Sequence, residues 1–135
     1  MVNIAEFNEK YLENWIYDGA ELSLTKGYDI KNLAKLYARL GDAFMGFIDN
    51  KLVGIGGIYP IVPGMGQAWL FLNKLPDHIA YAFVSIKEYL KLIAKKNNYK
   101  KVQIYCVKGN PKITNLAEHL GFKKVTELSL YEIGE

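Results

Sequence analysis

A long helical segment between two strand-like runs constrains the fold more than any other feature of the chain. The two runs are Ala68–Leu72 and Val102–Val107, and the helical pattern between them extends from Asp77 to Asn97. Strands separated by a helix of this length are joined by a crossover, which places them as parallel neighbours in one sheet. The sequence therefore predicts an α/β (α+β) domain built around these two strands.

Two further strands are predicted before this unit. Phe44–Ile48 and the apolar run Leu52–Ile58 flank the turn pair Asp49-Asn50, which indicates a hairpin. The next connection, Pro60–Gly66, contains a Pro-Gly pair suited to a type II turn. It is predicted as a hairpin connection, with a cover over a substrate pocket as the alternative.

The glycines of the apolar run have a structural interpretation. Gly54, Gly56 and Gly57 indicate either a β-bulge or a close approach of another backbone. An apolar strand surrounds them and no G-x-x-x-x-G-K pattern follows, so they do not indicate a nucleotide-binding loop.

Two helices are predicted ahead of the strands. Asn8 is placed to cap the first helix and Asp29 to cap the second. Gly41 is expected to end the second helix in the left-handed conformation, and the segment from Glu21 to Thr25 either prolongs the first helix or forms a turn. The two apolar faces are predicted from Tyr11, Leu12, Trp15 and Ile16 and from Ile30, Leu33, Ala34, Tyr37 and Leu40.

The long helix is predicted to cover the sheet. Asn97-Asn98 ends it before the next strand, and Lys123–Ile133 alternates in the manner of one or two closing strands. Its apolar stripe consists of Ile79, Ala82, Phe83, Ile86, Leu90 and Ile93, and Lys87, Glu88, Lys91 and Lys95 are expected to face away from the sheet.

Length and composition predict one domain, 1–135, with its own core, because half of the 135 residues are apolar. There is no apolar run of about 18 residues, so no membrane span is expected. Met1–Phe7 lacks the pattern of a secretory signal. The single cysteine, Cys106, allows no internal disulfide and no metal framework, and a cytoplasmic setting fits these features.

The charge pattern argues against specific nucleic-acid recognition. The chain has 17 basic and 14 acidic residues, a net charge of +3, and Arg39 is its only arginine. Bidentate contacts to bases and phosphates are therefore scarce. The cluster of Lys95, Lys96, Lys100 and Lys101 is interpreted as a solvated helix C-terminus, with nonspecific nucleic-acid binding as a lesser alternative.

The element order and two short motifs resemble a known family. Leu52–Ile58 is similar to the third strand of the acyl-CoA N-acyltransferase superfamily (the GNAT fold). Asn110 and the segment Asn115–Phe122 are similar to the final helix of that family, which commonly ends in Leu-Gly-Phe. The resemblance implies a GNAT-like mixed sheet with two N-terminal helices, a β-β-α-β-α core and closing C-terminal strands.

More narrowly, the whole chain resembles the short acyltransferase-like proteins of tailed bacteriophages. That group includes the internal virion protein of T7-like phages. A Trp-bearing strand, a glycine-free crossing, a long helix and a Gly-Asn step recur in it. Here these features correspond to Trp69, Leu72–Ile79, Asp77–Asn97 and Gly109-Asn110.

The resemblance implies an acyl-CoA site between the two central strands. In the family these strands splay, and the pantetheine arm pairs with the backbone of the first one. The pyrophosphate then lies on the turn entering the long helix. The residues carried over are Leu70, Phe71 and Leu72 for the arm, Asn73, Lys74 and His78 for the pyrophosphate, and Asn110, which either bonds the arm or holds its loop through an Asx-turn.

The expected phosphate cradle departs from the family pattern. No glycine occurs between Gly66 and Gly109, and Pro76-Asp77 is interpreted as a plain helix start. Side chains therefore occupy the turn where the family usually has glycines. Coenzyme A is expected to bind there more weakly, or in a different pose, than in a typical member.

The catalytic groups are left unassigned. Ala117 stands where the family's general-acid tyrosine is usual, and no carboxylate lies on the central strand to act as a base. His119 is interpreted as a surface residue, and only one of Tyr105 and Cys106 can face the gap. A water could relay the proton, and no metal site is predicted.

Two functions follow from the resemblance. The first is transfer of an acyl group from acetyl-CoA or another acyl-CoA to an amine of a small molecule or a protein. The alternative is a catalytically inactive phage protein on the same fold, acting in the virion or on a host protein. The expected location is the cytoplasm, meaning the host cytoplasm or the virion if a phage encodes the chain.

Overall fold

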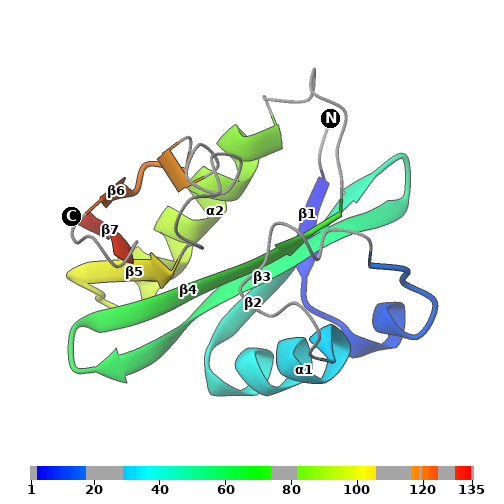
Figure 1. Cartoon of the computed structure of the whole chain (residues 1–135), viewed down its shortest axis with the longest axis horizontal. Coiled ribbons are helices and arrows are strands. Elements are labelled where there is room, and N and C mark those ends of the chain that lie inside the picture. The colour runs from blue at the N-terminus through cyan, green and yellow to red at the C-terminus, as the bar shows by residue number, and fades with distance from the viewer. Residues whose placement is uncertain are drawn as a thin grey trace.

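The computed structural model describes residues 3–17, 29–73, 82–105, 117–118, 120–124 and 130–134. These residues form a seven-stranded mixed sheet in the order β1-β2-β3-β4-β5-β7-β6, with α1 on one face and α2 on the other (Figure 1). The elements are β1 (Asn3–Glu6), the 3-10 helix η1 (Glu9–Leu12), α1 (Ile30–Leu40), β2 (Asp42–Ile48), β3 (Lys51–Val62), β4 (Met65–Leu72), α2 (Ala82–Lys96), β5 (Lys101–Tyr105), β6 (Lys123–Lys124) and β7 (Leu130–Gly134).

Two apolar cores hold the helices on the sheet. Successive side chains of a strand point to opposite faces. On β4, Ala68 and Leu72 pack under α2, whereas Trp69 and Phe71 pack under α1. The sheet is therefore buried on both faces, and the prediction that the long helix covers it is confirmed.

The predicted hairpins are confirmed, and their strands are longer than predicted. Asp49 and Asn50 have φ values of 51° and 64°, which suits the tight β2–β3 turn. Gly64, with φ of 80°, turns β3 into β4. Most of Pro60–Gly66 belongs to these two strands, so this segment is a hairpin connection.

The glycines of β3 mark close approaches and also a bulge, because the β2–β3 register shifts between Gly46 and Phe47 and leaves Val53, next to Gly54, without an opposite residue on β2. A Cβ on Gly57 would lie 2.3 Å from the carbonyl oxygen of Asp42, and one on Gly54 would lie 2.4 Å from Leu72 Cδ2. Gly41 was predicted to be left-handed, and this is wrong, because its φ of −162° is extended. A Cβ there would lie 2.2 Å from the carbonyl oxygen of Ile58, so the position has no room for a side chain.

The predicted first helix is only the short η1. Asn8 caps it as predicted, since its side chain accepts from the Lys10 N–H at 3.1 Å. Leu12 and Trp15 are buried, but Ile16 is 83% exposed and Tyr11 is 47% exposed. The assumed i, i+4 face is therefore wrong for Tyr11 and Ile16. Ahead of η1, the four-residue edge strand β1 was not predicted.

The second helix and the closing strands agree with the sequence. Asp29 caps α1 by accepting from the Asn32 N–H at 3.3 Å, and Ile30 and Ala34 are buried on its apolar face. Leu40 is 50% exposed and does not belong to that face. The prediction of closing strands is confirmed by β6 and β7, which pair with each other.

The end of α2 and the turn at Leu120-Gly121-Phe122 share one hydrogen-bond pattern. At the end of α2, the Tyr99 N–H donates to the Ala94 carbonyl and Asn98 has φ of 57°. In the Leu-Gly-Phe motif, the Phe122 N–H donates to the Ala117 carbonyl and Gly121 has φ of 94°. This is the Schellman arrangement, which requires a left-handed residue after the helix. The predicted start of α2 at Asp77 lies outside the described residues.

Candidate functional site

The two central strands pair at their beginnings and then part. β4 and β5 are parallel, as predicted, and they pair through Met65–Lys101, Gly66–Val102 and Gln67–Gln103. Beyond this point β4 continues to Leu72, and the remaining described residues of β5 pair with β7. Figure 1 shows β5 beside only the first part of β4. We call the opening beyond Gln67, as far as residues 3–17, 29–73 and 82–105 define it, the fork.

The alternation of β4 shows which backbone groups face the fork. In an antiparallel pair only every second residue bonds to the partner strand. The Asn73 N–H donates to the Val53 carbonyl at 2.8 Å, so Phe71, two residues earlier, also directs its backbone groups toward β3. Leu70 and Leu72 direct theirs to the opposite side, into the fork.

The residues predicted to bind the donor arm therefore differ in the direction of their backbone groups. Leu70 and Leu72 direct their backbone groups to the side away from β3, and their role in binding a donor stays a prediction. Phe71 has its backbone turned to β3 and its side chain, 4% exposed, packed under α1. Asn73 is 8% exposed and its Nδ2 donates to the Ile16 carbonyl at 3.2 Å, which ties the segment after η1 to the end of β4.

The other predicted site residues lie outside the described part of the chain. These are Lys74, His78 and Asn110, together with Cys106 and His119. Their assignments therefore stay predictions. Ala117 is described, and it is a buried residue of the core under α2, so the position of the family's tyrosine holds a packed methyl group.

A buried pair of glutamines closes the base of the fork. Gln67 and Gln103 form the last residue pair between β4 and β5, and each is 8% exposed. Gln103 Nε2 donates to Gln67 Oε1 at 2.9 Å, and Gln67 Nε2 donates to the Ala68 carbonyl at 3.2 Å. The backbone groups of Ala68 point to the same side of β4 as those of Leu70 and Leu72, so the Ala68 carbonyl faces β5.

This arrangement explains why the pairing stops there. The side-chain amide of Gln67 donates to the Ala68 carbonyl, which is the first carbonyl of β4 after the last residue pair. In a longer ladder, a backbone N–H of β5 would donate to this carbonyl. Buried amides that satisfy one another also fix the local geometry. This pair was not predicted, although the two central strands carry one glutamine each, Gln67 and Gln103, among mostly apolar residues.

Aromatic rings gather on the α1 face of β4, on the same face as the glutamine pair. Tyr37 lies 5.2 Å from Tyr59 and 5.4 Å from Trp69, measured between ring centroids. Trp69 lies 5.5 Å from Phe71. The indole N–H of Trp69 is buried and makes no hydrogen bond within the described residues. We call Tyr37, Tyr59, Trp69 and Phe71 the aromatic face.

One described group at the base of the fork has a shifted pKa. Burial raises the pKa of the Tyr99 phenol, and the nearby charge of Asp42 raises it further. Asp42 itself accepts from Asn97 Nδ2 at 2.8 Å and lies 3.4 Å from Lys96 Nζ. Tyr99 therefore stays protonated at neutral pH and is poorly suited to act as a base.

Solved structures of known proteins share this architecture. The acetyltransferase of the GNAT family from Staphylococcus aureus Mu50 aligns over 99% of both chains with a TM-score of 0.75 and 14% identity. The aminoglycoside acetyltransferase AAC(6')-Ib, in complex with ribostamycin and coenzyme A, aligns over 99% of this chain and 93% of its own, with a TM-score of 0.72 and 11% identity. A GNAT family acetyltransferase from Elizabethkingia anophelis with acetyl-CoA bound gives a TM-score of 0.69 and 15% identity, over 99% and 98% of the chains.

The chain has the GNAT fold. No protein-family model matches the sequence, and no curated protein matches it either. The narrower resemblance to bacteriophage proteins finds no support among these GNAT-fold structures. Among the residues that the structure describes, no helix is long and apolar enough to cross a membrane, and no cluster of His, Cys, Asp or Glu is arranged to hold a metal ion.

Proposed function

We propose that the protein is an acyl-CoA-dependent N-acyltransferase whose fork holds the pantetheine arm of the donor. The parting of β4 and β5 after Gln67 carries this proposal, because it leaves the backbone groups of Leu70 and Leu72 directed into an opening between parallel strands. Coenzyme A or acetyl-CoA is bound in two of the GNAT-fold structures named above, which supports the choice of donor.

The residues of the fork are suited to binding and polarising a thioester. The amine nitrogen of the acceptor attacks the carbonyl carbon, a C–N bond forms, and the C–S bond breaks as the thiolate leaves. The amine proton passes to the thiolate or to solvent water. The backbone N–H groups of Leu70 and Leu72 orient the arm and donate to its carbonyl oxygens without any side chain that titrates.

The acceptor is proposed to be an amine of a small molecule or a protein that enters along the aromatic face. Ring faces attract ammonium groups. Tyr37 and Tyr59 are partly exposed and stack on each other. The solved complex of AAC(6')-Ib with ribostamycin provides a first amine to try. Lys74, His78 and Asn110 remain proposed contacts of the donor.

Calorimetry tests the donor, with acetyl-CoA and longer acyl-CoAs titrated into the whole chain. Leu70→Pro removes the N–H that faces the fork and leaves the β3 ladder intact, because that N–H does not bond to β3. Leu70→Ala is the matched control, since it shortens the side chain and keeps the N–H. We expect Leu70→Pro to weaken acetyl-CoA binding about tenfold more than Leu70→Ala. Absence of heat at millimolar acetyl-CoA would contradict the proposal.

A second candidate is a non-catalytic binding protein on the same fold. Buried Ala117 favours it, because this position supplies no proton to a leaving thiolate. In its finer form the protein is encoded by a phage and acts in the virion or on a host protein. Release of free thiol from acetyl-CoA in the presence of an amine panel separates the two. Acetyl-CoA binding without thiol release would favour this second candidate.

A further inference from the structure

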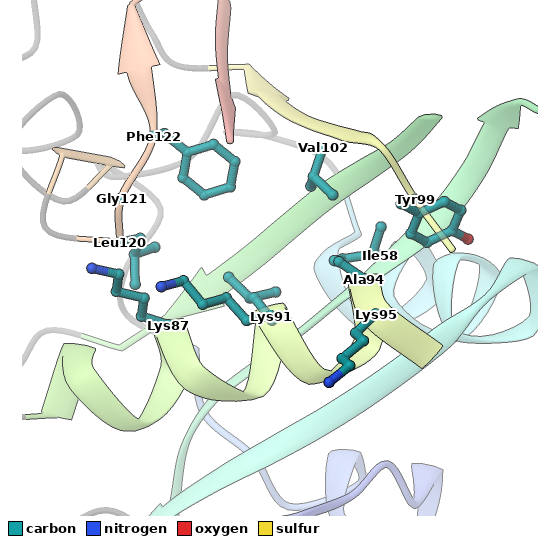
Figure 2. A pocket seen from close by; sticks show the side chains of 11 residues that line it. Ile58, Lys87, Lys91, Ala94, Lys95, Tyr99, Val102, Leu120, Gly121 and Phe122 are labelled. Atoms are coloured by element: carbon teal, nitrogen blue, oxygen red, sulfur yellow. The ribbon is translucent and has the colours of Figure 1, made fainter. Parts of the chain in front are cut away.

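A cavity of about 570 Å³ lies on the α2 face, away from the fork. It is open to solvent and is bordered by α2, by the start of β5 and by the turn at Leu120-Gly121-Phe122 (Figure 2). We call it the α2 cavity. Its buried apolar lining consists of Ile58, Leu90, Tyr99, Val102, Leu120 and Phe122, each at most 7% exposed.

The α2 cavity is a different place from the proposed donor site. Val102, in its lining, pairs with Gly66 within the closed part of the β4–β5 ladder. The fork opens beyond Gln67, at the other end of that ladder. A ligand in the α2 cavity would therefore contact the closed base of the fork and the second half of α2.

Three lysines of α2 line the cavity along one helix face. Lys87, Lys91 and Lys95 follow each other at a spacing of four residues, which places them on one side of the helix. Their methylene stems border the apolar lining while the charged ends reach toward solvent. In Figure 2, Lys87 and Lys91 extend toward the Leu120 side and Lys95 turns away from Val102 and Phe122.

These charges have no acidic partner among the residues that the structure describes. Lys96, the next residue of the helix, pairs with Asp42, whereas Lys87, Lys91 and Lys95 make no ion pair with any described residue. Among the described residues of the lining there is no acidic side chain. The sequence predicted these three lysines to face away from the sheet. Lys91 and Lys95 are exposed, and the structure adds that an apolar hollow lies beside all three.

We propose that the α2 cavity binds a straight-chain carboxylate of medium length. The apolar lining would hold the hydrocarbon chain, and the carboxylate would lie against the ammonium groups of Lys87 and Lys91. The volume is in the range of small-molecule sites, and a chain of about eight carbons fits it with room to spare. An apolar hollow with a one-sided positive rim matches a ligand that is apolar along its length and negative at one end.

Calorimetry with three ligands of equal chain length tests the chemistry. Octanoate is expected to bind, octanol to bind at least tenfold more weakly, and octyltrimethylammonium not to bind. Decanoate should bind about tenfold more tightly than octanoate, because each buried methylene adds about threefold to fourfold in affinity. Equal binding of octanoate and octanol, or no binding of octanoate at millimolar concentration, would overturn the proposal.

Variants test the location. The double substitution Lys87→Met and Lys91→Met keeps the apolar stems and is expected to weaken octanoate binding at least tenfold. Lys51→Met, at the first residue of β3, removes a lysine charge away from the cavity and is the control that should change nothing. Ala94→Phe fills the cavity and should abolish binding. If that variant fails to fold, NMR shifts of Leu90, Val102 and Leu120 in the wild-type protein decide, and shifts confined to other residues would overturn the proposal.

Discussion

The two edges of β4 differ in how far they are paired. On one edge, β4 pairs with β3 from Gly54–Leu72 to Val62–Met65. On the other, it pairs with β5 over three residue pairs and then leaves it. The same strand thus closes the sheet on one side and opens it on the other. Since a strand edge needs partners for its backbone groups, the open edge is the place where a ligand can supply them.

Glycines of β3 allow the close packing of the paired strands β2, β3 and β4, which we call the closed region. Loss of Gly57 from it is expected to destabilise the protein more than any other change proposed below. Gly57→Ala puts a Cβ 2.3 Å from the Asp42 carbonyl oxygen and 2.9 Å from Ala43 Cα, both backbone atoms that cannot rotate away. We expect the free energy of unfolding to fall by more than about 3 kcal/mol, measured by urea denaturation.

Gly64→Ala is the control for this prediction. A Cβ there would meet only Lys100 Cγ at 3.7 Å, and its φ of 80° alone costs about 1 kcal/mol. If Gly57→Ala destabilised the protein no more than Gly64→Ala, the tight packing of β2 on β3 would not be what holds the closed region.

The closed region was readable from the sequence and the open edge was not. Turn residues such as Asp49-Asn50 and Gly64, and the stripe of α2 around Ile86, are local signals, so they predict hairpins and a covering helix. The point where β4 leaves β5 depends on a register between residues 36 positions apart, which no local pattern encodes. It was inferred through the family resemblance alone.

Short edge elements were missed for a related reason. The four residues of β1 and the single turn of η1 are held by tertiary pairing, and too few residues were available to show a period. Gly41 illustrates the reverse case. A glycine after a helix usually reports a left-handed cap, but here it reports the close approach of β3, which the sequence does not show.

The glutamine pair tests the open edge directly, with a smaller effect. Gln103→Leu leaves the buried Gln67 amide without its partner, and we expect a loss of about 1–3 kcal/mol in the free energy of unfolding. The double variant Gln67→Leu/Gln103→Leu should lose less than the sum of the single variants, because both amides are then gone. Additive losses would show that the two amides do not act as a pair. Under the proposed function, both variants should also weaken acetyl-CoA binding.

A substitution at Asn73, at the end of β4, distinguishes a structural role from a role in binding acetyl-CoA. Asn73→Ala removes the hydrogen bond to the Ile16 carbonyl and should cost about 1 kcal/mol of stability. Because both described donors of Asn73 contact the protein, acetyl-CoA affinity should change less than twofold. A tenfold loss of acetyl-CoA affinity at unchanged stability would instead show that Asn73 contacts the donor.

The smallest effect concerns pH and the closed base of the fork, where the ring of Tyr99 packs against Gly66. Burial and the charge of Asp42 raise the pKa of Tyr99 above its value of about 10 in the unfolded chain. The resulting stability is fully present below pH about 10 and is lost as the pH rises through the folded pKa.

Tyr99→Phe lacks this titration. We expect it to change stability by less than about 1 kcal/mol at pH 7 and to flatten the decline in stability above pH about 10, followed by urea denaturation at each pH. An equally steep decline in both proteins would mean that the base of the fork takes no part in the alkaline loss of stability.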